Sequence, residues 1–200
     1  MRLITEKYRE INREIHGAIK NYGKNSLQWV PHIWKLIEEG KIKTILDYGC
    51  GKGVLSLNIP YFISNYDPGV VQFEEMPSPA ELVVCTNVLE CVEPEYLEYV
   101  IDHLNFLTEG CLFLTICTKA APGKLLDGRN FHLNVKTQQE WEDLISKWFV
   151  IKNRDTKEDE FLLMCQPRVR EELPSLPEVM DIPVTSNDVS LNQINIGGTC

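Results

Sequence analysis

Hydrophobic residues recur at helical spacing near the start of the chain. Within residues 5–20 the apolar side chains come three or four positions apart, which is the period of one helix face: Tyr8, Ile11, Ile15 and Ile19. Asn12 and His16 also lie four positions apart and share another, polar face of the same helix. A polar face of this kind is predicted to point to solvent.

A second helix is expected over residues 27–39. Pro31 lies near its start, where a missing backbone N–H costs little, and Gly40 follows its last turn. Residues 1–40 are therefore predicted to form an N-terminal segment of helices.

From residue 41 onward, short apolar runs alternate with helical patterns. The apolar, β-prone runs occupy four stretches, residues 44–46, 63–66, 81–85 and 111–118. Helical patterns follow them at three places, residues 54–59, 94–108 and 137–147. This alternation predicts an α/β protein with a Rossmann-like, doubly wound and mostly parallel sheet.

The regular pattern ends with two strands and then dissolves. Residues 149–154 and 160–166 flank a charged turn, which predicts a terminal antiparallel hairpin. Residues 41–167 are thus predicted to be the core domain. Residues 168–200 contain three prolines and no periodicity, and they are predicted to be an extended or disordered tail.

One expected element is missing from the pattern. Residues 69–80 contain two glutamates and two prolines and look like a loop, where a doubly wound sheet of ordinary size has a further strand and helix. The sheet is therefore predicted to be compact, with its third strand short or missing.

The first strand runs into a turn rich in glycine. Asp47 closes the strand, and Gly49, Gly51 and Gly53 follow at alternate positions before a helix. Glycines there permit positive φ angles and let a ligand approach the backbone. The spacing fits neither the phosphate loop of nucleotide triphosphatases nor the dinucleotide fingerprint, since Val54 stands where that fingerprint needs glycine.

The run from Asp47 to Gly53 resembles motif I of the class I methyltransferases that use S-adenosylmethionine (SAM). The resemblance implies that Asp47 and the backbone of Gly49, Cys50, Gly51 and Gly53 hold the methionine end of SAM. It also implies a second acid after the next strand, on the ribose hydroxyls. Asp67, at the end of residues 63–66, is in that place.

A longer stretch, residues 8–53, is similar to a group of small phage and bacterial methyltransferases that largely lack assigned substrates. In such proteins the segment before motif I commonly folds over the cofactor, which implies that Tyr22 lies near SAM. A turn aromatic packed on the core is the alternative for Tyr22. The whole resemblance covers residues 8–166.

The loop after the third apolar run also matches this family, with two differences. Thr86 and Asn87 are expected beside the cofactor, but Asn87 and Cys91 replace the commoner aspartate and histidine. Both differences remove an ionisable group, so this loop is expected to supply no proton acceptor. Glu90 is expected either to face the site or to point to solvent, and solvent is the favoured alternative.

A second polar loop, residues 126–132, follows the central strand. It contains Asp127, Arg129 and His132 around a glycine and matches the same group of small methyltransferases. Arg129 suits a carboxylate or phosphate, and His132 titrates near neutrality. Both are predicted to be catalytic, on the substrate side of the site, although an exposed turn with a local Asp127–Arg129 pair is the alternative.

The composition of the chain indicates which kinds of binding partner are unfavourable. The chain has 200 residues, 44% hydrophobic residues and a formal net charge of −9, which disfavours general binding to nucleic-acid backbones. No run is apolar enough to span a bilayer. Seven scattered cysteines without a C-x-x-C pair indicate a reducing, cytoplasmic setting and no metal site.

The sequence therefore predicts a SAM-dependent methyltransferase whose acceptor is a small molecule or a nucleotide. A SAM-binding protein without catalytic activity, acting as a partner or regulatory subunit, is the alternative. A nucleotide-binding oxidoreductase is a weaker alternative, because the acid before the glycines and Val54 both disfavour it.

Overall fold

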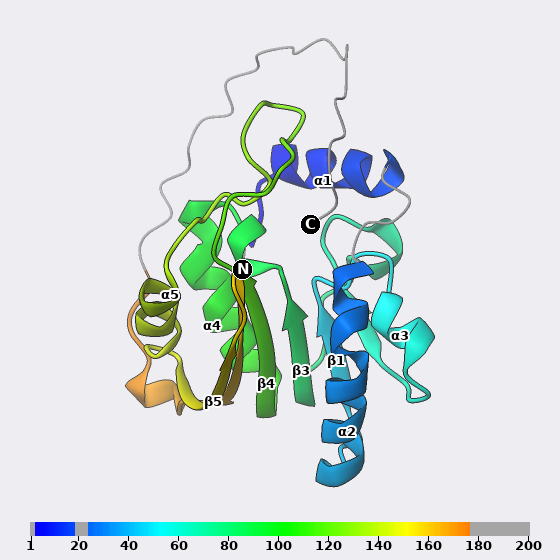
Figure 1. Cartoon of the computed structure of the whole chain (residues 1–200), viewed down its shortest axis with the longest axis vertical. Coiled ribbons are helices and arrows are strands. Elements are labelled where there is room, and N and C mark those ends of the chain that lie inside the picture. The colour runs from blue at the N-terminus through cyan, green and yellow to red at the C-terminus, as the bar shows by residue number, and fades with distance from the viewer. Residues whose placement is uncertain (1–2, 19–23, 177–200) are drawn as a thin grey trace.

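The computed structural model describes residues 3–18 and 24–176. Their central element is one sheet of six strands in the order β2-β1-β3-β4-β6-β5 (Figure 1). The strand bounds are β1 Ile45–Tyr48, β2 Ser64–Tyr66, β3 Ala80–Thr86, β4 Thr108–Cys117, β5 Phe149–Thr156 and β6 Glu160–Pro167. The first four strands run parallel, and β6 pairs antiparallel with both β4 and β5. The predicted parallel sheet with a terminal hairpin is confirmed.

The register of the parallel strands sets where their ends meet. Tyr48 of β1 pairs with Tyr66 of β2, so the next residues, Gly49 and Asp67, leave the sheet side by side. The backbone N–H of Gly49 donates to the carbonyl oxygen of Tyr66 at 2.7 Å and continues the ladder by one bond. Ligands of open α/β sheets bind beyond such carboxyl ends.

The prediction of a missing third strand is also confirmed. All of residues 67–79 are described, and they form a short 3-10 helix, Val71–Phe73, and a loop, without a strand. Strand β2 is consequently an edge of the sheet.

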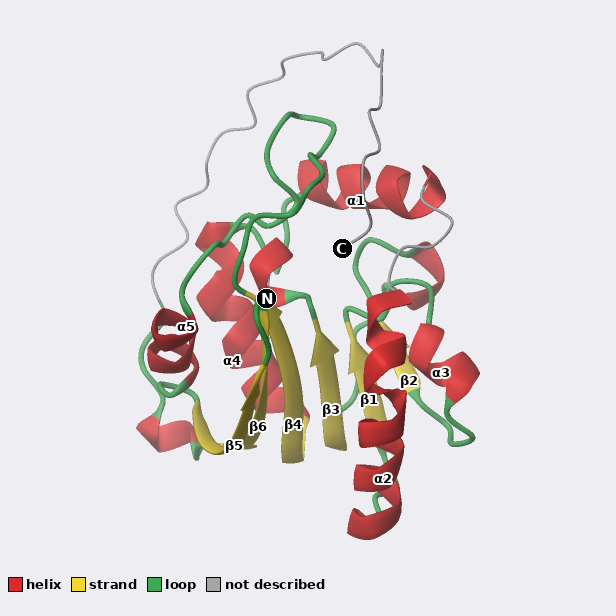
Figure 2. Ribbon diagram, in the orientation of Figure 1, coloured by secondary structure: helices red, strands yellow, loops and turns green. Residues whose placement is uncertain are grey.

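Helices cover both faces of the sheet, and one helix lies across its end (Figure 2). Their bounds are α1 Glu6–Ala18, α2 Val30–Gly40, α3 Val54–Asn58, α4 Leu97–Leu107 and α5 Gln138–Ile145. Helices α2 and α3 pack on one face, and α4 and α5 pack on the other. Helix α1 crosses the edge at which the parallel strands end.

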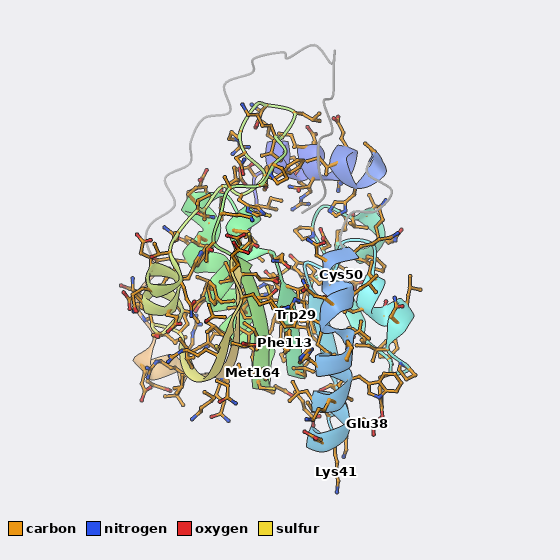
Figure 3. All side chains as sticks on the ribbon, in the orientation of Figure 1. Trp29, Glu38, Lys41, Cys50, Phe113 and Met164 are labelled. Atoms are coloured by element: carbon orange, nitrogen blue, oxygen red, sulfur yellow. The ribbon has the colours of Figure 1, made fainter. Side chains whose placement is uncertain are left out.

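The face under α2 has an aromatic centre. Trp29, which precedes α2, meets Phe113 of β4 edge to face with ring centroids 5.8 Å apart (Figure 3). Ile33 and Ile37 follow at helical spacing and are at most 1% exposed. Each such side chain stabilises the fold by about 1.5–3 kcal/mol through burial.

The opposite face is held by α4. Its apolar stripe, with Ile101, Leu104 and Leu107 fully buried, matches the predicted pattern. The helix ends at Leu107, however, and β4 already begins at Thr108, so residues 109 and 110 belong to the strand and not to the end of the helix. The turn into the strand is stabilised by the Thr108 hydroxyl, which donates to the Leu104 carbonyl at 2.7 Å.

Among the described residues, no helix is both long and apolar enough to cross a membrane. The six described cysteines are free thiols.

The described start of the predicted tail, residues 168–176, packs on the core. The backbone of Arg168 donates to the Trp148 carbonyl at 2.9 Å, and Asn105 Nδ2 donates to the Arg168 carbonyl at 3.3 Å. Arg170 forms an ion pair of 2.5 Å with Asp102, whose side chain is 3% exposed. These contacts join distant parts of the chain, and local periodicity does not report them. Residues 177–200 lie outside the described residues.

We expect Arg170→Ala to lower the free energy of unfolding by about 1–3 kcal/mol, because Asp102 then loses the charged donor of a buried carboxylate. Urea unfolding measures this change. Lys35→Ala is the control, since Lys35 pairs with Glu39 at an exposed position, and such pairs contribute about 0–1 kcal/mol. Equal stability of the two variants would show that residues 168–176 do not hold the core.

Candidate functional site

The glycine turn after β1 has the backbone that the sequence predicts. Gly49, Gly51 and Gly53 have φ angles of 72°, 53° and 68°. Gly53 then serves as the N-cap of α3. Side chains rarely adopt such positive φ angles, which explains why glycine stands at each alternate position.

Asp67 fastens this turn to the next loop. Its Oδ2 accepts a hydrogen bond of 2.9 Å from the Gly51 N–H, and its Oδ1 accepts one of 2.8 Å from the Gly69 N–H. The residue is 8% exposed. The predicted acid at the end of the second strand therefore lies directly beside the predicted glycine turn, and each carboxylate oxygen keeps a second lone pair for a ligand.

Asp47 lies below the turn and is almost inaccessible. Burial raises the pKa of its carboxyl to about 8, with the nearby Asp67 charge adding to the effect. Burial therefore favours the protonated form of this carboxyl. Cys50 is also buried, and burial raises the pKa of its thiol, so it is a neutral side chain in the turn.

The loop after β3 closes a second side of the site. Asn87 has a φ of 54°, and its amide Nδ2 donates to Glu90 Oε1 at 3.3 Å. Thr86 precedes it, half-buried at the strand end. Glu90 is fully buried, so its predicted exposure is wrong. Its Oε1 also accepts the Cys117 N–H at 2.9 Å, which ties the loop to β4, and burial raises the pKa of its carboxyl.

Helix α1 is docked to this loop at its N-terminal end. Glu93 Oε2 accepts the Thr5 N–H at 2.8 Å, and Glu93 Oε1 accepts the Thr5 hydroxyl at 2.7 Å. The Thr5 hydroxyl in turn accepts the Tyr8 N–H at 3.1 Å and caps the helix. The Tyr8 phenol donates to the Cys91 carbonyl at 2.6 Å. These hydrogen bonds connect the start of α1 to the loop after β3, although the residues lie more than 80 positions apart in the chain.

The other end of α1 lies over the glycine turn and the loop after β2. Arg13 forms an ion pair of 2.6 Å with Glu74. His16 Nε2 lies 3.8 Å from Asp67 Oδ2. Burial lowers the pKa of His16, and Lys52 adds to this, whereas Asp67 opposes it. A methyl group added at Gly69 would lie 2.8 Å from the Asn12 Cβ, which shows how closely the helix approaches.

Asn12 and His16 are therefore site residues that the sequence analysis missed. Their spacing of four residues was visible, but a polar face of a helix normally points to solvent. Only the position of α1 across the sheet end turns that face inward (Figure 2).

A cavity with an open mouth lies between α1 and the sheet end. Residues from α1 and its approach, from the turn after β1, from the loops after β2 and β3 and from α4 line it: Leu3, Ile4, Tyr8, Asn12, His16, Tyr48, Gly49, Asp67, Pro68, Gly69, Asn87, Val88, Cys91, Val92, Glu93 and Val100. Three of the predicted cofactor residues, Gly49, Asp67 and Asn87, are among them.

The two predicted catalytic residues are not among the lining residues. Arg129 is exposed, forms an ion pair of 2.8 Å with Asp127, and lies over the Tyr8 ring, 5.2 Å from its centroid. His132 is 5% exposed, and its Nδ1 donates to the Lys119 carbonyl at 2.6 Å. Tyr22, the predicted lid residue, lies outside the described residues.

Comparison with solved structures identifies the fold. The chain resembles a Burkholderia thailandensis 1,6-didemethyltoxoflavin-N1-methyltransferase, solved with 1,6-didemethyltoxoflavin and S-adenosylhomocysteine (SAH), with a TM-score of 0.59 and 13% identity over 84% of this chain and 92% of that one. It also resembles DhpI, solved with SAH, with a TM-score of 0.56 and 14% identity over 83% of this chain and 100% of that one. No family model matches the chain, and no curated protein matches it in sequence.

A third similar structure is the magnesium protoporphyrin IX methyltransferase of Synechocystis with bound SAH, with a TM-score of 0.50 and 16% identity over 70% of this chain and 82% of that one. The chain therefore has the Rossmann-like fold of the class I methyltransferases. Identities this low establish the fold alone, and a fold does not by itself assign an activity.

We expect Gly49→Ala to destabilise the protein by about 1–3 kcal/mol, since a strained backbone and a steric clash act together. A Cβ at this position would lie 2.3 Å from Val88 Cγ2, and the φ of 72° would be strained. Chemical unfolding measures the change. The control is Gly17→Ala at an exposed position of α1, where an added Cβ would have no atom within 4 Å. A Gly49 variant as stable as the control would contradict this geometry.

We expect Thr5→Val to loosen the N-terminal end of α1, because the change removes the cap of Tyr8 and one of the two hydrogen bonds to Glu93. Amide exchange in the first turns of α1 should become about five- to tenfold faster, as losing a cap costs about 1 kcal/mol. Hydrogen–deuterium exchange measures this, with Thr156→Val on exposed β5 as the control. Unchanged exchange would mean that other contacts hold the helix.

Proposed function

We propose that the protein is a SAM-dependent methyltransferase acting on a small-molecule acceptor. The observation that carries this proposal is the Asp67 carboxylate, held by the N–H groups of Gly51 and Gly69 at the base of a cavity on a class I methyltransferase fold. The solved structures of this fold with bound SAH support the cofactor, and the toxoflavin-type acceptor of one of them supports a small molecule.

The residues of the cavity fit SAM by their chemistry. The carboxylate oxygens of Asp67 suit the two hydroxyls of a ribose. Of the turn residues, Gly49 lines the cavity. A Cβ at Gly49 would lie 2.3 Å from Val88 Cγ2 and one at Gly51 would lie 3.5 Å from His16 Cε1, so Val88 and His16 would border a ligand at this turn. Bound SAM would supply an activated methyl group to a nucleophile of the acceptor.

On this proposal three further predicted cofactor residues, Asn87, Thr86 and Asp47, contribute to binding the same ligand. Asn87 offers an amide and a carbonyl oxygen on the cavity wall. Thr86 and Asp47 lie behind the wall at the ends of β3 and β1, and on this proposal they support the turn and the loop. His16 and Asn12 face the Asp67 side from α1 and would bind or cover the ribose.

The helix α1 contributes by excluding water and positioning the ligands. It is attached at the β3 loop by Glu93 and at the β2 loop by Glu74. A cofactor and an acceptor held between α1 and the sheet end would react as neighbours, and such positioning supplies much of the rate of a bimolecular transfer.

On this proposal Arg129 and His132 are positioning residues. Arg129 lies over the ring of Tyr8, which lines the cavity, and His132 holds the strand exit at Lys119. Through Arg129, the loop that contains both residues contacts Tyr8 on α1. The direct role in proton transfer that the sequence predicts for His132 stays a prediction.

We expect Asp67→Asn to raise the dissociation constant of SAH about 10- to 100-fold, because a carboxylate accepts hydrogen bonds from hydroxyls more strongly than a carboxamide. Titration calorimetry measures the binding. The control is Asp155→Asn on the exposed part of β5, which should bind SAH as the unchanged protein does. Equal binding by the Asp67 variant would contradict the proposal.

Methyl transfer itself is tested with isotope-labelled SAM and pools of metabolites. The proposal expects label in a small-molecule product. Tight binding of SAM and SAH without transfer to any acceptor would favour the alternative, a SAM-binding protein without catalytic activity.

A further inference from the structure

The cavity has two chemically different ends. At the glycine turn its lining is polar and includes Asn12, His16 and Asp67. At the opposite end, where the start of α1 meets the loop after β3, the lining is mostly apolar: Leu3, Ile4, Tyr8, Cys91, Val92 and Val100. The two ends are separated along α1, because residues 5 and 8 contact the β3 loop and residues 12 and 16 contact the β2 loop and the turn.

The apolar end contains one charged lining residue, Glu93. Its side chain accepts two hydrogen bonds, both from Thr5, and the residue is 5% exposed. Among the described residues no ion pair to Glu93 is formed. Each of its oxygens has a second lone pair, so the carboxylate can accept a further donor.

Among the described residues that line the cavity there is no lysine or arginine. Arg129 forms its ion pair with Asp127 and contacts the ring of Tyr8, which lines the cavity. It exerts an electrostatic influence on the site, since Glu93 contributes to the raised pKa of Arg129, but its charge is already balanced by the Asp127 carboxylate.

The charge of a ligand decides how favourably it can occupy the apolar end beside Glu93. A phosphate or carboxylate placed in the apolar end would lose its water next to the Glu93 carboxylate and would find no lysine or arginine among the described lining residues, which is unfavourable on both counts. An ammonium or an aromatic N–H group would lose water too, but it would gain a hydrogen bond to a buried carboxylate.

We propose that the methyl acceptor is a small apolar molecule without negative charge, whose ammonium or N–H group lies against Glu93. The inference rests on the proposed function and refines its acceptor class. It places nucleotides and other phosphorylated acceptors outside that class, and it makes Glu93 the residue that determines specificity.

Three probes that share an indole ring and differ in charge test the charge preference. Tryptamine carries a positive charge, 3-methylindole is neutral, and indole-3-acetate is negative. Their dissociation constants are measured by titration calorimetry on the full chain saturated with SAH, with adenosine and adenosine monophosphate as a second matched pair. We expect tryptamine to bind at least about tenfold more tightly than indole-3-acetate, and adenosine to bind more tightly than its monophosphate.

The variant Glu93→Gln identifies the residue responsible. Glutamine keeps a carbonyl oxygen for the Thr5 N–H, so α1 stays docked, but the charge is lost. Tryptamine binding should weaken about tenfold while 3-methylindole and SAH binding stay as they were. Glu95→Gln, two positions away and exposed, is the matched control and should leave the order of the probes intact.

The possible results separate the two proposals. Absence of SAH binding would overturn the proposed function itself. SAH binding together with equal or tighter binding of the anionic probes, or with no detectable binding of the cationic and neutral ones, would overturn the acceptor class alone. An unchanged tryptamine preference in Glu93→Gln would overturn the role of Glu93.

Discussion

The site depends on one buried carboxylate that holds two loops together. Asp67 accepts the N–H groups of Gly51 and Gly69 and thereby fixes the turn after β1 against the loop after β2. Hydrogen bonds from backbone amides to a buried carboxylate are among the stronger ones in proteins, because the local dielectric is low and the acceptor is charged. The register of β1 and β2 brings the residues to the same edge, and the carboxylate then fixes their relative position.

Because the sheet ends at β2, the loop after β2 depends on α1 for its packing. With no strand beyond β2 among residues 67–79, the loop at this edge has few neighbours of its own. Helix α1 supplies them, through the Arg13–Glu74 ion pair and the approach of Asn12 to Gly69. The same helix reaches Glu93 at its other end, so it joins the two loops that border the cavity and forms its cover.

Local patterns predicted the parts of the site that lie within a few residues of each other. The glycine turn and the acid at Asp67 are both visible as short motifs, and the structure places each as expected. The fold class followed from the alternation of strands and helices, because each element shows its own period.

Contacts between distant segments were not predictable in this way. The inward face of α1, the burial of Glu90 and the contact of Thr5 with Glu93 depend on the docking of elements that lie from 27 to 88 positions apart in the chain. Nothing in the immediate neighbourhood of these residues distinguishes a docked polar side chain from a solvated one. For the same reason, the sequence of residues 168–176, which has no periodicity, did not predict that they pack on Asp102 and Trp148.

The central claim is that the cavity under α1 is a SAM site, and a crystal structure grown with SAH tests it most directly. The account predicts SAH between α1 and the glycine turn, with its ribose hydroxyls about 3 Å from the Asp67 carboxylate, as hydrogen bonds require. Its homocysteine end should lie beside Gly49 and Asn87. SAH bound at another place, or a crystal soaked in SAH whose cavity holds none, would contradict the account.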